Sequence, residues 1–334
     1  MRFLVAVLLL VVGTGCDGDG SESGGSNLDC RRGEPCNSGF ECRQNEVGSY
    51  ECLPPLMGEG GSDGGGGISP PFGGEGGIFP PPEVCSTNCP DIDWIRIEGG
   101  SFMMGSPNGV GDSNEHPQHE VNVPSFSLAQ SETTVAQYRA CVDAGHCTEP
   151  STEYNTCTWS PIAGEQEDHP INCVDWSQAR AFSQWVGGDL PSEAEWEFAA
   201  RSRGQDFAYP WGDEAATCER AVMNDGGGGC GRGSTWPVCS KPQGHSEQGL
   251  CDLSGNVYEW VLDEYVDNYN RAPDDGSPVC SEPTCSQNVA SRRVNRGGSW
   301  YGDADILRAA DRGGNRPGYR YDYLGFRARR TQSP

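Results

Sequence analysis

Apolar residues recur at helical spacing in three short stretches between residues 134 and 201. Each stretch begins at a residue that can cap a helix, namely Thr134, Asp175 or Ser192. Gln137 and Glu195 complete capping boxes for the first and third stretches. The positions expected to face the core are Val135, Tyr138, Val142, Ala179, Phe182, Trp185, Trp196, Ala199 and Ala200. The pattern predicts three short helices.

Between and after these stretches the apolar residues come in short bursts. Examples are residues 94–97, 121–123 and 257–261, each bounded by Gly, Pro, Asn or Asp. Such bursts are typical of short strands joined by long loops. A few helices among many loops predict an α+β fold with little regular secondary structure, in which disulfides hold the loops.

The first 84 residues show no such patterning. Residues 3–12 form an apolar run behind Arg2, too short to span a bilayer but typical of an export signal. The run ends in Gly13-Thr14-Gly15-Cys16, which resembles a bacterial lipobox, although Gly13 stands where leucine is usual. Residues 1–16 are therefore interpreted as an export signal, with Cys16 as the lipidated first residue of a protein of the bacterial cell envelope. The alternative is cleavage nearby and secretion.

Three further segments precede the large domain. Residues 17–29 are mostly Gly, Ser, Asp and Asn with almost no apolar side chain, which predicts a flexible tether. Residues 30–52 hold four cysteines and end in a Gly-Ser-Tyr-Glu-Cys sequence that looks like the tail of an EGF-like module. Residues 53–84 are dominated by Gly and Pro and predict a linker. We expect the large domain to span residues 85–334.

Charge and cysteine content narrow the function classes. The chain carries 48 acidic and 23 basic residues, for a net charge of −25. This balance argues against nucleic-acid binding and against docking on anionic lipid, since both need clustered cations. Leaving Cys16 aside, 16 of the 17 cysteines remain, an even number that indicates disulfides in an oxidising compartment. We therefore expect contact with a membrane only through the lipid anchor.

Long motifs in one order identify a family resemblance across nearly all of residues 92–328. The most specific are LPSEAEWEFAAR at 190–201 and GLCDLSGNVYEW at 249–260. Others are IEGGSFMMG at 97–105, RGGSW at 296–300 and LGFR at 324–327. The domain resembles formylglycine-generating enzymes, the sulfatase-modifying factor family. That resemblance implies a variant of the C-type lectin-like fold.

The resemblance also locates the copper site of the family's oxidases. There, two cysteines five residues apart follow the Gly-Gly-Ser motif and bind Cu(I), which soft thiolates select. The corresponding residues here are Gly302 and Leu307, and no cysteine follows Cys285. Copper and formylglycine-generating oxidase activity are therefore not expected. The alternative is an enzyme that uses a different cofactor or other thiols, such as Cys280 and Cys285, although their spacing is also that of a short disulfide loop.

The family resemblance further implies a calcium loop. Its ligands would be the carboxylates of Asp252 and Glu259 and the main-chain oxygens of Gly255 and Val257. Calcium prefers such hard oxygen donors. The alternative is a sharp turn whose acidic side chains are solvated.

Because the copper-binding cysteine pair is absent, we favour a binding function over catalysis. The resemblance places a cleft at Ser299, Trp300, Tyr301, Arg312, Asn315 and Tyr319. Aromatic side chains there are suited to a peptide, glycan or protein partner in the cell envelope. The alternatives are that the aromatic side chains form core, and that the arginines pair with the domain's own acids.

Overall fold

The computed structural model describes residues 41–44, 50–53, 84–282, 285 and 291–331. The chain divides into two compact units, residues 1–76 and 77–334. In the first unit, β1 (Glu41–Gln44) pairs antiparallel with β2 (Tyr50–Leu53), with Cys42 opposite Cys52 in the register. The predicted export signal, Cys16, the tether and almost all of the linker lie outside the described residues, as does most of the EGF-like segment.

The second unit contains the three predicted helices. They are α1 (Val135–Asp143), α2 (Trp176–Trp185) and α3 (Glu193–Ala200). Each begins with a complete capping box, from Thr134 to Gln137, Asp175 to Gln178, and Ser192 to Glu195. These caps satisfy backbone N–H groups that a helix leaves unpaired at its start. The predicted helix starts are confirmed, and Gln178 is an addition to the second cap.

Short strands form three small sheets around the helices. One sheet has the order β10 (Leu324–Gly325), β7 (Tyr258–Glu264), β8 (Arg293–Arg296) and β9 (Arg312–Asn315). A second has the order β11 (Arg329–Thr331), β6 (Phe126–Ala129) and β3 (Trp94–Ile97). The third is the hairpin of β4 (Gly100–Met104) and β5 (His119–Val123). Three short 3-10 helices lie in the segments between strands, at Ser113–Glu115, Pro242–Gly244 and Ala304–Leu307.

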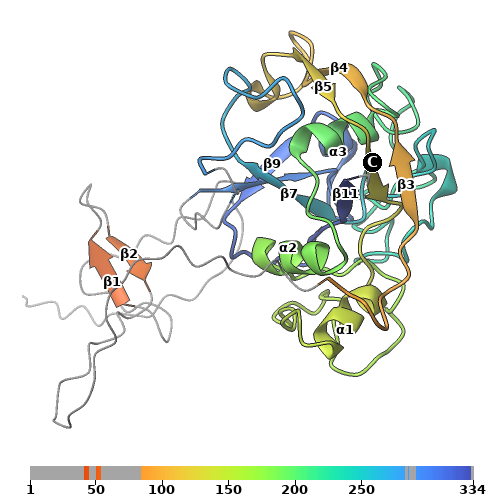
Figure 1. The fold of residues 1–334 in the computed structure, drawn as a ribbon, viewed down its shortest axis with the longest axis vertical. Helices are drawn as coiled ribbons and strands as arrows, with labels where there is room; N and C mark the ends of the chain where they lie inside the picture. Colours follow the sequence, from red (N-terminus) through yellow and green to blue (C-terminus); the bar gives the residue numbers. More distant parts are fainter. Residues whose placement is uncertain (1–40, 45–49, 54–83, 283–284, 286–290, 332–334) are drawn as a thin grey trace, which may run out of the picture. The chain divides into compact units, whose positions relative to one another are not determined.

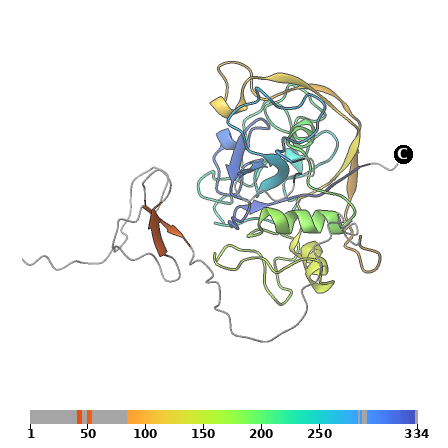
Figure 2. The same ribbon diagram turned by 60° about the vertical axis from the view of Figure 1, so that its left-hand side comes forward.

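The core is built around α3 and α2. Figure 1 shows α3 near the β4–β5 hairpin and the sheet of β7 and β9, and α3 contacts β4, β5, β7 and β8. Trp196 and Phe198 of α3 are buried in this part of the core. In Figure 2, α1 and α2 lie together at one end of the domain, where Tyr138, Phe182 and Phe326 pack ring against ring. The α+β prediction with long loops is confirmed.

Six disulfides tie the loops of the second unit. They join Cys85–Cys89, Cys141–Cys147, Cys157–Cys173, Cys218–Cys230, Cys239–Cys251 and Cys280–Cys285. A domain with this many bridges belongs to an oxidising, extracytoplasmic compartment. The bridge between Cys280 and Cys285 confirms the short disulfide loop. None of the described helices is long and apolar enough to cross a membrane.

Candidate functional site

The two positions that correspond to the oxidases' copper ligands, residues 302 and 307, lie among apolar side chains. Gly302 is buried, and its N–H donates to Ser299 O at 2.9 Å in a tight turn. Leu307, at the end of the turn Ala304–Leu307, is fully buried beside Ile306 and Met223. A Cβ at residue 302 would collide with the side chain of Ile306. Neither residue offers a sulfur donor, and the side chain of Ile306 lies in the space beside residue 302, so these two positions as they stand do not fit copper.

Directly beside this turn lies an aromatic surface. Trp300 Nε1 donates to Asp322 O at 3.1 Å, which holds residues 299–301 against the segment 319–323. The ring of Tyr301 packs edge-on against Trp300 at 5.8 Å between centroids. Tyr301 is 67% exposed, so most of its ring faces solvent.

The segment 319–323 continues the aromatic surface. Tyr321 lies 5.1 Å from Tyr319 and 5.0 Å from Tyr323 between ring centroids, and Tyr154 reaches Tyr321 from a distant loop at 6.3 Å. Tyr319 and Tyr154 are 37% and 40% exposed. Burial raises the pKa of Tyr323 to about 12, so its hydroxyl stays protonated at neutral pH. We call Tyr154, Tyr301, Tyr319, Tyr321 and Tyr323 the tyrosine surface.

The other members of the predicted cleft have different surroundings. Arg312 on β9 is buried, and its guanidinium donates to both carboxylate oxygens of Glu193, each at 2.7 Å. Its guanidinium also lies over Tyr269. Asn315 is half-buried and pairs with Arg293 in the β8–β9 register. Ser299, Trp300 and Tyr301 are consecutive, Tyr319 packs edge-on against Tyr321 in the segment that Trp300 contacts, and Arg312 is committed to an internal ion pair.

The predicted calcium loop lies between β7 and the Cys239–Cys251 disulfide. Asp252 and Glu259 are both buried, and Asp252 Oδ2 accepts from Cys239 N at 2.6 Å. Burial raises the pKa of Asp252, and the neighbouring Glu259 raises it further. Glu259 accepts from Trp196 Nε1 at 2.9 Å and pairs with Arg327.

Sequence reasoning missed a third acid in this group, Glu132. Its carboxylate accepts from Val257 N at 3.0 Å and from Asn256 Nδ2 at 2.7 Å. Burial, followed by the charges of Asp252 and Glu259, raises its pKa well above the ordinary value. The available signal was an acid two residues before the cap Thr134 and within a family motif, but that signal does not reveal which loop the acid contacts.

The carboxylates of this group are hard donors of the kind calcium prefers, although both oxygens of Glu259 already accept from Arg327. Three buried carboxylates, Glu132, Asp252 and Glu259, face one buried guanidinium, Arg327. An excess of buried carboxylate is costly unless it is protonated or matched by positive charge. A calcium ion would be held by the Asp252 and Glu259 carboxylates and by main-chain oxygens of Gly255 and Val257, and it would supply that charge. Calcium binding here stays a prediction.

Comparisons with known proteins agree on the family and the fold of this domain. A family model for the sulfatase-modifying factor enzyme 1-like domain matches residues 81–332. The formylglycine-generating enzyme of Streptomyces coelicolor is 30% identical over 286 residues, covering 70% of this chain and 87% of that protein. The structure of PvdO from Pseudomonas aeruginosa matches with a TM-score of 0.61 and 28% identity, covering 76% of this chain and all of that one.

One relative is much longer. The serine/threonine-protein kinase pkn1 of Chlamydia caviae is 32% identical over 247 residues, which is 70% of this chain. The match spans only 37% of the kinase. The resemblance therefore concerns a domain of that protein and leaves the rest of it unmatched.

Proposed function

Since the chain belongs to the sulfatase-modifying factor enzyme 1-like domain family, we propose that it is an extracytoplasmic binding module that recognises a peptide or glycan. The observation that carries the proposal is the pairing of two features on adjacent residues. Tyr301 exposes most of its ring to solvent, while residue 302 has no thiol and lies against the side chain of Ile306. The family scaffold is present, and the surface beside the positions that correspond to the oxidases' copper ligands offers aromatic contact area.

The tyrosine surface is suited to recognition. Tyrosine provides a large, rigid contact area at low cost in side-chain entropy, with a hydroxyl that can donate or accept a hydrogen bond. Tyr319, Tyr321 and Tyr323 are spaced so that their rings contact one another, which limits their motion before a ligand binds. Apolar faces with polar tips match both the C–H faces of sugars and the side chains of an extended peptide.

The expected location supports an envelope partner. Six disulfides indicate an oxidising compartment, as described above. We propose in addition that Cys16 is lipidated, which would tether the domain to a membrane through the segments 17–84. Mass spectrometry of the mature N-terminus distinguishes a diacylated Cys16 from a secreted chain that begins nearby.

Capture of partners from envelope extract tests the binding role. The bait is the mature full chain, compared with a Tyr301→Ala, Tyr319→Ala double variant. We expect the double variant to lose partners that the wild type recovers, and a glycan array with a peptide library then separates the two ligand classes. A Met103→Ala, Val110→Ala variant is the matched control, since both side chains are exposed apolar groups, the first on β4 and the second in the loop that follows it. Recovery of the same partners by wild type and double variant would exclude the tyrosine surface.

A further inference from the structure

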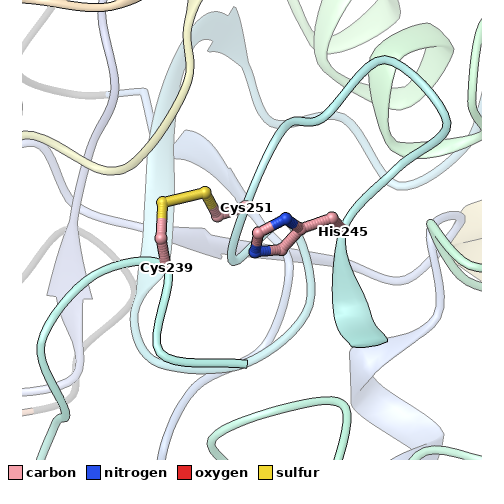
Figure 3. A group of neighbouring side chains, drawn as sticks. All are labelled: Cys239, His245 and Cys251. Carbon is pink, nitrogen blue, oxygen red and sulfur yellow. A yellow bond between two sulfur atoms is a disulfide. The ribbon is translucent and has the colours of Figure 1, made fainter. Parts of the chain in front are cut away.

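Beyond the tyrosine surface, the structure places a histidine against a disulfide. Cys239 and Cys251 are bonded, and the imidazole of His245 points toward their bridge (Figure 3). One ligand atom from each of the three residues lies within 4.8 Å of the others. Among residues 84–282, 285 and 291–331, no other grouping of this kind contains a cysteine.

The imidazole is held there without a hydrogen bond to account for its position. Nε2 of His245 is buried and has no hydrogen-bond partner among the described residues. A buried, unpaired imidazole nitrogen costs free energy unless it gains a partner. A neutral imidazole nitrogen is also a common metal ligand.

We infer that reduction of the Cys239–Cys251 bridge opens a binding site for a zinc-class ion, with the two thiolates and His245 as ligands. Two cysteines and one histidine are an established donor set for zinc, which leaves a fourth position for water or another ligand. The site shares no residue with positions 302 and 307 and does not depend on the proposed binding function.

The required movement is small. The Cα atoms of Cys239 and Cys251 are 5.1 Å apart. Zinc–sulfur bonds of about 2.3 Å in a tetrahedron place two sulfurs roughly 3.7 Å apart, so the sulfurs must separate after the bridge opens. Rotation about the side-chain bonds can supply that separation from this Cα spacing. The imidazole of His245 already lies within reach.

The chemistry balances with a thiol reductant. A dithiol gives two electrons and two protons to the bridge and becomes a disulfide itself, while Cys239 and Cys251 become thiols. Zinc then displaces the two thiol protons, because the thiolate is the ligand. Neither step changes the oxidation state of zinc. Thiol–disulfide exchange with an oxidised dithiol, which accepts the two electrons and becomes a dithiol, restores the bridge and releases the ion.

The neighbouring charges favour a cation. The carboxylate of Asp252 follows Cys251 directly and accepts from the backbone N–H of Cys239 at 2.6 Å, which fixes the backbone of one ligand. Charges on groups around ligands orient them and tune affinity. Lys241 is the nearest basic side chain along the segment, and its ammonium donates to Cys218 O at 2.6 Å.

The Cys218–Cys230 disulfide provides a matched control. It has the same sequence separation of 12 residues, and its Cα atoms are 5.7 Å apart. Cys230 and Cys239 both have positive φ, at 56° and 59°. Among the described residues, this pair has no histidine grouped with it as a third ligand. If reduced disulfides bound zinc without regard to their surroundings, both pairs would do so equally.

The experiment measures zinc bound to the full chain with and without a phosphine reductant, in the presence of calcium to saturate any hard-cation site. We expect the oxidised protein to bind no zinc tightly and the reduced protein to gain one site. Cobalt(II), used as a coloured substitute for zinc, should show thiolate-to-metal absorption. His245→Gln should weaken zinc binding by roughly tenfold or more. The Cys218→Ser, Cys230→Ser variant should retain the site.

His245→Gln keeps the disulfide and removes a nitrogen that makes no hydrogen bond, so it tests the ligand without threatening the fold. Thermal unfolding of its oxidised form should match the wild type. Equal zinc affinity of reduced wild type and His245→Gln would overturn the proposal. So would a bridge that resists reduction in the folded protein, or reduced wild type without a tight site.

Discussion

Arg327 and Glu259 form a buried two-pronged ion pair, with Nε 2.7 Å from Oε2 and Nη2 2.8 Å from Oε1. Both side chains are almost fully excluded from solvent. The pair joins the C-terminal LGFR motif to the GNVYEW motif on β7, and Arg327 also donates to Cys251 O at 2.7 Å. One guanidinium therefore connects the end of the chain to both the predicted calcium loop and the Cys239–Cys251 bridge.

Arg327→Met should destabilise the domain by about 3–5 kcal/mol, because Glu259 would be left buried without its partner. Chemical denaturation of the oxidised protein measures this loss. Arg96→Met is the control, since Arg96 and Glu98 form an exposed pair and their loss should change little. A fall as small as the control's would mean that the carboxylate is neutralised by another route.

Calcium should raise the thermal unfolding temperature of the wild type, because binding to the folded state alone adds stability. Asp252→Asn should remove most of that increase by removing one anionic ligand. Asp112→Asn is a suitable control because Asp112 belongs to a separate acidic group with Glu115 and Asp311. Calorimetric scans with calcium and with a chelator make the comparison. An increase of the same size in Asp252→Asn would place any bound calcium elsewhere.

Stability should fall as pH rises from about 4 to 7, because the folded state keeps a proton at Asp311 that the unfolded chain releases. The pKa of Asp311 is raised from 3.8 to about 7, chiefly by burial; the charge of Glu115 acts in the same direction, while Arg296 and Arg308 oppose the shift. The slope from this group is up to about 1.4 kcal/mol per pH unit.

Asp311→Asn should remove that part of the slope, measured by denaturant unfolding across the pH range. Part of the slope should persist, because burial likewise raises the pKa of Asp263 to about 7. Below pH 4 the trend reverses, since Arg308 and other hydrogen bonds lower the pKa of Glu115 to about 2 against the effect of burial. A variant with the wild-type slope would show that Asp311 titrates normally.

Copper chemistry provides a direct test of the turn at residues 299–307. The wild type should form no aldehyde on a Cys-x-Pro-x-Arg peptide when supplied with Cu(I) and oxygen, because residues 302 and 307 provide no thiolate. A Gly302→Cys, Leu307→Cys variant should bind Cu(I) only weakly despite its two thiols, because the side chain of Ile306 occupies the space at residue 302. Adding Ile306→Ala should improve binding. Aldehyde formation by the wild type would support the alternative that the protein is an enzyme.

Local sequence signals were sufficient to predict the helices and the short strands. Capping residues such as Thr134 and Ser192 act within one turn of the helix they begin, so their effect is visible in the sequence. The family motifs likewise predicted the fold and the absence of a cysteine pair. In contrast, the surroundings of Arg312 were not visible, because Glu193 lies 119 residues away along the chain.

The sequence by itself determined the helix starts, the short strands, the oxidising compartment and the family, since each depends on residue type and near spacing. Only the tertiary structure decided which buried charges meet, as in Glu132 with Asp252, and which aromatic rings face solvent. It also decided that His245 lies against the Cys239–Cys251 bridge. Such contacts join loops with little regular secondary structure, and no periodic pattern in the sequence records how those loops fold over one another.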